Sequence, residues 1–178
     1  MLEKGLYEIV DTDQLNEADI LPITELYRAL YLRKYSFFNP QLNEKFFQHT
    51  LKERIFRFKA LRKNGRIDAF ISYYVKNGVM TGAFIGHDTR LPEELGLYRQ
   101  TIALNMAEAE KSGMLLHLSA GAGAFKIFRS AVPCIEFDAV YYDHLPFQRR
   151  LAWRFLKTLL DGWQRIASIL LRNAEALT

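Results

Sequence analysis

The strongest constraint on the fold is a pair of Asn-Gly dipeptides, at residues 64–65 and 77–78. Each lies between segments in which apolar and polar residues alternate. Asn-Gly in this setting favours a type I′ hairpin turn, because both central residues take positive φ angles. Residues 55–62, 67–76 and 79–86 are therefore predicted to form three consecutive strands of an antiparallel meander.

Helical spacing of apolar residues predicts the elements around this meander. One helix is expected to start at Asp19 or at Leu21-Pro22 and to run to about Lys34, a second covers residues 44–52 with Asn43 as its N-cap, and a third covers residues 97–111. Short strands are predicted at residues 6–10 and 114–118. The segments 79–86, 97–111 and 114–118 then read as a parallel β-α-β crossover.

The C-terminal third predicts three further elements. Gly121-Ala122-Gly123 is expected to open a short helix ending near Arg129, and residues 134–142 to form a strand with Cys134 as a small buried hydrophobe. A long helix is predicted from residue 147 to about residue 172. Its cations beside Trp153 and Trp163 leave three interpretations open: packing on its own domain, on another subunit, or on a membrane surface.

Composition sets broader limits. The chain has 178 residues and is 49% hydrophobic, which predicts one folded domain over residues 1–178, with a core at 6–142 and a C-terminal helix at 145–174. The single cysteine excludes an internal disulfide framework, and no metal site is expected. Apolar runs are too short for a membrane span, and the N-terminus does not resemble a signal peptide, so we expect a cytoplasmic protein.

The formal net charge of +4 conceals a strong segregation along the chain. Residues 1–27 carry −6, residues 28–66 carry +9, residues 67–144 carry −3 and residues 145–178 carry +4. A basic block can attract an anionic ligand, whereas the simpler interpretation is a pair of solvated faces balanced by the acidic N-terminal segment.

The element order, together with residues 30–41, 116–121 and 125–129, resembles the GNAT superfamily of acyl-CoA N-acyltransferases. The second and third stretches are most similar to the acetyltransferase-like domains of the Fem peptidyltransferase and cellulose-biosynthesis-associated branch, which often occur as one half of a tandem protein. The resemblance implies an α/β (α+β) fold with a mixed sheet, in which the meander is followed by a parallel β-α-β crossover and a long C-terminal helix. It also implies that the pantetheine arm of CoA lies along the strand 79–86, where the strand 114–118 splays away.

Three positions depart from the family pattern. The segment between strand 79–86 and helix 97–111 has Pro92, Glu93 and Glu94 where a glycine-rich pyrophosphate loop is typical. Phe128 stands where the family often has a tyrosine acid, and a long helix replaces the last strand. These departures leave two hypotheses: an N-acyltransferase, with acyl-CoA, aminoacyl-tRNA or an acyl-carrier protein as donor and a small-molecule or peptide amine as acceptor, or a catalytically inactive binding module, dimeric through the C-terminal helix or the sheet edge.

The candidate site residues fall into three groups. His117 and Ser119, predicted to share one face of a strand, and Lys126 are the catalytic candidates, with His117 as the general base. The candidates for cofactor binding are Ile85, Gly86, His87, Arg90, Gly96, Gly121 and Phe128. The candidates for substrate binding are Tyr31, Lys34, Tyr35, Asn39 and Tyr73.

Overall fold

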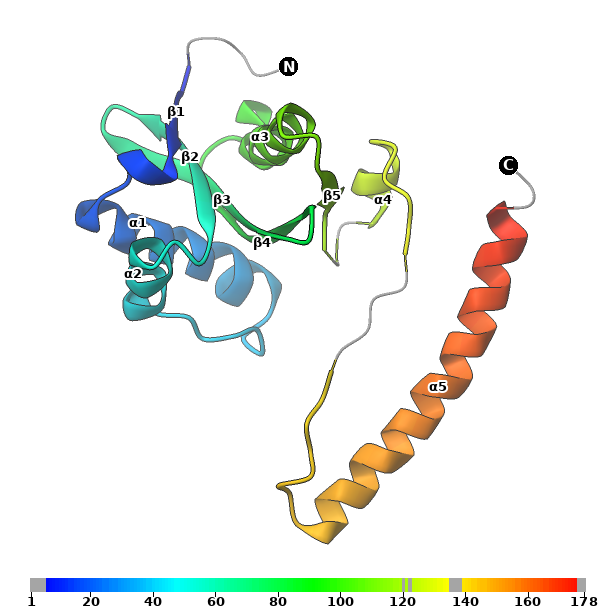
Figure 1. Ribbon diagram of the computed structural model, residues 1–178. Helices are drawn as coiled ribbons and strands as arrows, with labels where there is room; N and C mark the ends of the chain where they lie inside the picture. The colour runs from blue at the N-terminus through cyan, green and yellow to red at the C-terminus, as the bar shows by residue number, and fades with distance from the viewer. Residues whose placement is uncertain (1–5, 120, 122, 135–138, 176–178) are drawn as a thin grey trace. The chain divides into compact units, whose positions relative to one another are not determined.

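The computed structural model describes residues 6–119, 121, 123–134 and 139–175, with side chains as far as residue 164 (Figure 1). The chain divides into two compact units, Met1–Ser119 and Ala120–Thr178. The first unit holds a five-stranded sheet, and the second holds α4 and α5.

The sheet is mixed, with strand order β1-β2-β3-β4-β5. Neighbouring strands pair antiparallel from β1 to β4, and β5 is parallel to β4. The predicted α/β fold class, with a meander followed by a parallel crossover, is therefore confirmed. The strands are β1 (Glu8–Asp11), β2 (Arg57–Lys63), β3 (Arg66–Lys76), β4 (Val79–His87) and β5 (Leu115–His117).

The two Asn-Gly turns have the predicted geometry. Asn64 and Gly65 have φ angles of 50° and 75°, and Asn77 and Gly78 have φ angles of 51° and 77°. Positive φ at both central residues is the signature of a type I′ turn, whose twist matches that of the flanking strands. These turns fix the register of β2, β3 and β4, and so they position the edge of β4.

The helices of the first unit are α1 (Glu17–Tyr27), a π-helical segment (Arg28–Tyr35), α2 (Glu44–Lys52) and α3 (Leu97–Lys111). The predicted bounds of α2 and α3 are confirmed. The predicted start of the first helix is wrong, because Asn16 is the N-cap and its side chain accepts a hydrogen bond from the Ala18 N–H. Pro22 consequently lies inside α1 rather than in its first turn.

Helices cover both faces of the sheet: α1 and α2 lie on one face and α3 on the other (Figure 1). Adjacent residues of β3 show the alternation, since Phe70 packs in the cluster with Tyr27 and Phe47, while Ala69 packs with Leu104 of α3. Each face of the central strands is therefore buried, and the edge of β4 beyond β5 is left as the place where a ligand can reach backbone atoms.

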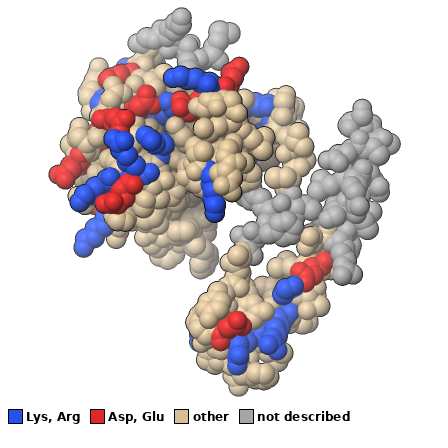
Figure 2. Space-filling model, in the orientation of Figure 1, with Lys and Arg blue, Asp and Glu red and all other residues tan. Residues whose placement is uncertain are grey.

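Ion pairs join the acidic N-terminal segment to the basic segment. Arg54 binds Asp13 at 2.8 Å, Lys59 binds Asp11 at 2.6 Å, and an additional pair links Arg62 of β2 with Asp19 of α1 at 2.9 Å. Acidic and basic side chains accordingly intermingle on the visible face of this unit (Figure 2). The simpler interpretation of the +9 segment is favoured, and this segment gives little support to a polyanionic donor such as aminoacyl-tRNA.

The second unit holds α4 (Gly123–Ile127) and α5 (Phe147–Glu175). Cys134 is exposed, so the prediction of a buried cysteine is wrong. Of the strand predicted at 134–142, Cys134 and residues 139–142 are not in a strand, and residues 135–138 lie outside the described part. No helix in the described ranges combines the length and apolarity needed to cross a bilayer.

Candidate functional site at the open edge of β4

The β4 strand pairs with β5 along only the first third of its length. Only Val79, Met80 and Thr81 pair with β5, opposite residues 115–117. The remaining residues of β4, from 82 to 87, pair with β3 on the other side but have no β5 partner. Among the described residues no strand pairs with their outward side, and we call this unpaired side the open edge; such an edge is a template for an extended ligand.

Ser119 marks the point where the chain leaves β4. Its φ angle is 56°, and its Oγ donates a hydrogen bond to the Gly82 carbonyl at 2.6 Å. The prediction that Ser119 shares a strand face with His117 is wrong, because β5 ends at His117 and the left-handed residue Ser119 turns the backbone away. The strands β4 and β5 therefore separate at Gly82, which we call the branch point.

Asn105 of α3 lies beside this branch point. Its Nδ2 would be 3.7 Å from a Cβ placed on Gly82, so the missing side chain of Gly82 leaves space next to the amide. Asn105 is 1% exposed, and its Oδ1 has no hydrogen-bond partner among the described residues. Buried amide oxygens are normally bonded, so an unpartnered one beside an open edge indicates a place for a ligand donor.

Aromatic side chains of the π-helical segment lie against β4. Tyr31 stacks on Tyr27 with ring centroids 4.6 Å apart, and the Tyr35 ring meets it edge-on at 6.2 Å. Burial raises the pKa of Tyr31, while a hydrogen bond from the Ile85 backbone opposes this, which is the effect of an N–H donating to the phenol oxygen. Asn39 holds the segment by donating from Nδ2 to the Tyr31 carbonyl at 2.9 Å. Three of the predicted substrate residues are thus brought together.

His87 ends β4 beside the first turn of α3. Its ring meets Tyr98 edge-on at a centroid distance of 6.2 Å. Burial lowers the pKa of His87, the charge of Lys34 lowers it further, and Asp88 and Glu93 oppose the shift. The imidazole is therefore neutral at pH 7, and its Nδ1 is buried without a hydrogen-bond partner among the described residues. The charge of the substrate candidate Lys34 therefore acts on the cofactor candidate His87.

The start of α3 faces this cluster. Gly96 precedes the helix with a φ of 60°, and no side chain caps the first turn. The Arg99 guanidinium lies over Gly96, at 2.9 Å from the position of a Cβ. A helix start without a side-chain cap and with an arginine beside it is suited to an anion, although Glu93 and Glu94 lie in the preceding turn.

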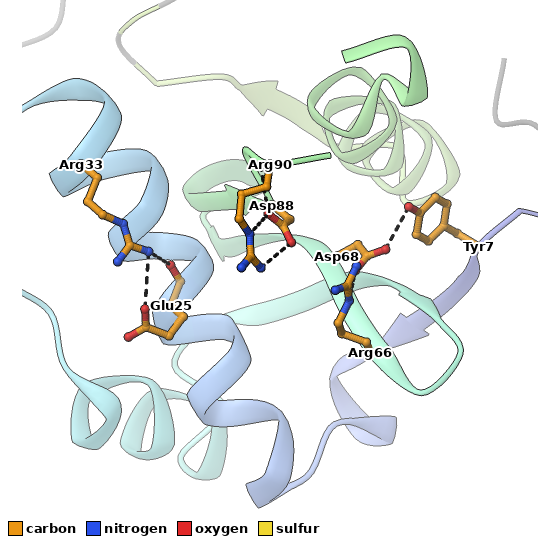
Figure 3. Close-up of polar contacts among 7 residues, drawn as sticks. All are labelled: Tyr7, Glu25, Arg33, Arg66, Asp68, Asp88 and Arg90. Atoms are coloured by element: carbon orange, nitrogen blue, oxygen red, sulfur yellow. Dashed lines mark hydrogen bonds and ion pairs between the residues drawn. The ribbon is translucent and has the colours of Figure 1, made fainter. Parts of the chain in front are cut away.

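Arg90 pairs with a neighbouring carboxylate, and its predicted role in phosphate binding stays a prediction. Its Nε and Nη2 bind the two carboxylate oxygens of Asp88 at 2.9 and 2.8 Å (Figure 3). The pKa of Asp88 is lowered first of all by this hydrogen bonding. On the neighbouring strand β3, the Asp68 carboxylate also accepts two hydrogen bonds, one from the Arg66 Nε and one from the Tyr7 hydroxyl (Figure 3). Arg90 is therefore committed to a buried carboxylate.

Tyr73 is the β3 partner of Gly82, but its side chain packs on the α3 side of the sheet with Met80 and Ala109. It lines a cavity of about 390 Å³ together with Arg57, Lys59 and Glu108, near the C-terminus of α3. Gly86 faces α1, where a Cβ would meet the Phe70 ring at 2.5 Å, so its role is close packing. The sheet therefore separates Tyr73 from Tyr31, whereas Gly86 lies between Ile85 and His87 of β4.

The remaining candidates belong to the second unit. Lys126 is 9% exposed in α4, whereas the Phe128 side chain is 88% exposed. Gly121 has a φ of 80°. Their predicted roles stay predictions.

Comparison with known proteins identifies the fold. No family model and no curated protein matches the sequence. Among solved structures, a ribosomal-protein-alanine N-acetyltransferase from Brucella melitensis biovar Abortus 2308 matches 79% of this chain and 99% of its own, with a TM-score of 0.54 and 16% identity. An aminoglycoside N-acetyltransferase in complex with CoA matches 82% of this chain and 100% of its own, with a TM-score of 0.53 and 13% identity.

A ribosomal-protein-S18-alanine N-acetyltransferase from Escherichia coli matches 70% of this chain and 75% of its own, with a TM-score of 0.51 and 23% identity. The fold is that of the GNAT N-acetyltransferases. The resemblance to the Fem-like branch of this fold stays a prediction.

Two residues of α3 beside this candidate site were missed by sequence reasoning. Arg99 follows the helix-opening Gly96 by three residues, and this spacing places both on the first turn. Asn105 occupies an inward position of α3 among apolar residues, and a polar residue at a core position is itself a signal. Both lie on α3, which the sequence analysis treated only as a crossover helix.

Proposed function

We propose that this chain is an N-acyltransferase that moves an acyl group from acyl-CoA to an amine. The observation that carries the proposal is the open edge of β4 from residue 82 to residue 87. The amides of a pantetheine arm can bond to such an edge as an added strand does. The CoA complex of the aminoglycoside N-acetyltransferase with the same fold supports CoA as the donor.

Residues on α3 would hold the donor. The Asn105 amide offers both an acceptor and a donor to an amide of the arm where Gly82 leaves room. The first turn of α3 and Arg99 would bind the pyrophosphate, because helix N–H groups and a guanidinium both favour phosphate oxygens. Arg99 takes the role that the sequence had suggested for Arg90.

The acceptor would approach from the side of Tyr31, Tyr35 and Asn39. Its nitrogen attacks the thioester carbonyl carbon, the C–S bond breaks, and CoA leaves as the thiolate. In this proposal His117, the last residue of β5, takes the proton from the amine beside the branch point. Positioning of the two reactants supplies much of the rate enhancement.

Calorimetric titration with acetyl-CoA and longer acyl-CoAs tests the donor site. We expect wild-type binding, and an Arg99→Ala variant that binds about tenfold more weakly, because one charge-assisted contact is lost. Arg54→Ala is the matched control, since it removes an arginine that pairs with Asp13. A wild-type chain that binds no acyl-CoA, or an equal loss in Arg54→Ala, would contradict the proposal and favour the inactive binding module.

Turnover tests the chemistry separately. Free thiol released from acetyl-CoA is measured against a panel of peptide and small-molecule amines. We expect His117→Gln to lower kcat while leaving the Kd for acetyl-CoA unchanged. If His117→Gln retains the wild-type kcat at every pH, then His117 is not the base.

A further inference from the structure

Within the second unit, the described residues leave the apolar face of α5 uncovered. Apolar side chains recur along it at spacings of four and three, and most of them are more than half exposed. At about 100° per residue, the apolar positions from Phe147 round to Trp153 cover an arc of about 240°. The large residues that are more than half exposed are Phe147, Leu151, Phe155, Leu159, Leu160 and Trp163.

The opposite side of α5 is a polar stripe of mainly positive charge. Arg150, Arg154, Lys157 and Asp161 follow one another at helical spacing. Asp161 pairs with Lys157, and no carboxylate of the described residues pairs with Arg154. Lys and Arg side chains gather on the visible side of this helix (Figure 2). The stripe therefore carries uncompensated positive charge.

We propose that α5 binds an anionic lipid surface. Its apolar face would be buried at the boundary between headgroups and acyl chains, and its basic stripe would lie among the headgroups. A long helix with an apolar face, a Lys- and Arg-rich polar face and low net hydrophobicity is suited to lie in the membrane interface. Each cation near an anionic leaflet adds to the attraction. Arg149, on the apolar side of the first turn, reaches the headgroups by extending its side chain.

Two features favour lipid over a second copy of the chain. A helix pair covers a seam much narrower than this arc, so pairing would leave apolar side chains uncovered, whereas a lipid surface accepts the whole face. Trp153 lies at the boundary between the apolar face and the basic stripe, which is where tryptophan is favoured at a membrane interface.

The chain offers a specific probe, because its two tryptophans, Trp153 and Trp163, both lie on α5. Tryptophan emission of the full chain is recorded with two kinds of vesicle. One is phosphatidylcholine alone, and the other is an equal mixture of phosphatidylcholine and the anionic lipid phosphatidylglycerol. We expect a blue shift and co-sedimentation with the anionic vesicles, and binding at least about tenfold weaker to the neutral ones. Added salt should reduce the binding.

Substitutions on each face of α5 test the contributions of the two faces separately. Leu151→Glu and Phe155→Glu should abolish the shift, and Arg154→Glu should weaken binding to anionic vesicles only. Lys45→Glu, which changes an exposed cation of α2 by the same charge, is the matched control and should bind as wild type. Far-UV circular dichroism verifies that each variant is folded.

Two results would overturn the proposal. One is an emission spectrum that neither vesicle changes. The other is a dimer, seen by light scattering, that persists with vesicles and dissociates in Phe155→Glu, which would assign the face to a second copy.

Discussion

At the scale of single residues, Asn105 illustrates a conflict between stability and binding. Its carboxamide is buried with an unpartnered Oδ1, so the folded state loses the hydration of that group without compensation. We predict that Asn105→Leu raises the free energy of unfolding by about 1 kcal/mol and weakens acetyl-CoA binding. Urea unfolding and calorimetry measure the two effects. Asn39→Leu is the contrasting variant, because it removes a hydrogen bond to Tyr31 and should destabilise.

The Tyr31 phenol lies near the Ile85 backbone at the open edge of β4. A donor arm that adds to β4 would compete with the phenol oxygen for that backbone. We predict that Tyr31→Phe lowers the free energy of unfolding by about 1 kcal/mol and tightens acetyl-CoA binding severalfold, because the competing group is gone. Tyr35→Phe keeps the edge-on contact with Tyr31 and should leave the Kd unchanged. Weaker binding by Tyr31→Phe would instead make the hydroxyl a ligand contact.

At the scale of elements, the packing of β4 against α1 depends on a missing side chain. A Cβ at Gly86 would lie 2.5 Å from Phe70 and 2.9 Å from the Leu26 backbone, whereas one at Gly82 would make only ordinary contacts, from 3.7 Å. We predict that Gly86→Ala destabilises the chain by about 2 kcal/mol and that Gly82→Ala changes stability by less than about 1 kcal/mol. Thermal unfolding of the pair measures the difference. Equal stability changes in the two variants would show that α1 moves aside for the new Cβ without loss of stability.

Elements determined by local chemistry were predictable from the sequence. The Asn-Gly turns, α2 with its Asn43 cap and the α3 crossover depend on neighbouring residues alone. The π-helical segment Arg28–Tyr35 was not predicted, because apolar spacing does not distinguish a five-residue from a four-residue hydrogen-bond repeat.

The site was predictable only in part. Tyr31, Lys34, Tyr35, Asn39 and His87 were named as candidates because they lie near the ends of recognisable elements, and their roles stay predictions. The pairing of Arg90 with Asp88 was not foreseen, because composition does not show that the two side chains turn toward each other. Asn105 was missed because the absence of a hydrogen-bond partner is a property of three-dimensional packing.

At the scale of the whole molecule, the groups whose pKa changes on folding lower the stability at both ends of the pH range. The folded state lowers the pKa of His87 from 6.5, so the unfolded chain takes up that proton first and stability falls as the pH drops below 6.5. The pKa of Glu25 is lowered, mainly by its hydrogen bond with Arg28, and that of Asp88 by Arg90. Their contributions are lost as the pH falls through 4.5 and 3.8.

At alkaline pH the stability changes through groups whose pKa is raised, rather than lowered, in the folded state. Burial raises the pKa of Tyr7 and of Tyr27 from 10.0 to about 12, so the unfolded chain loses these protons first and stability falls as the pH rises above 10. The pKa of Lys59 is also raised, because hydrogen bonds with Asp11 and Glu108 outweigh its burial. We predict a stability plateau from about pH 6.5 to about pH 10, measured by urea unfolding across the range. His87→Gln should flatten the acid fall between pH 6.5 and pH 5, and Tyr27→Phe the alkaline fall, whereas variant curves parallel to wild type would place the linkage on other groups.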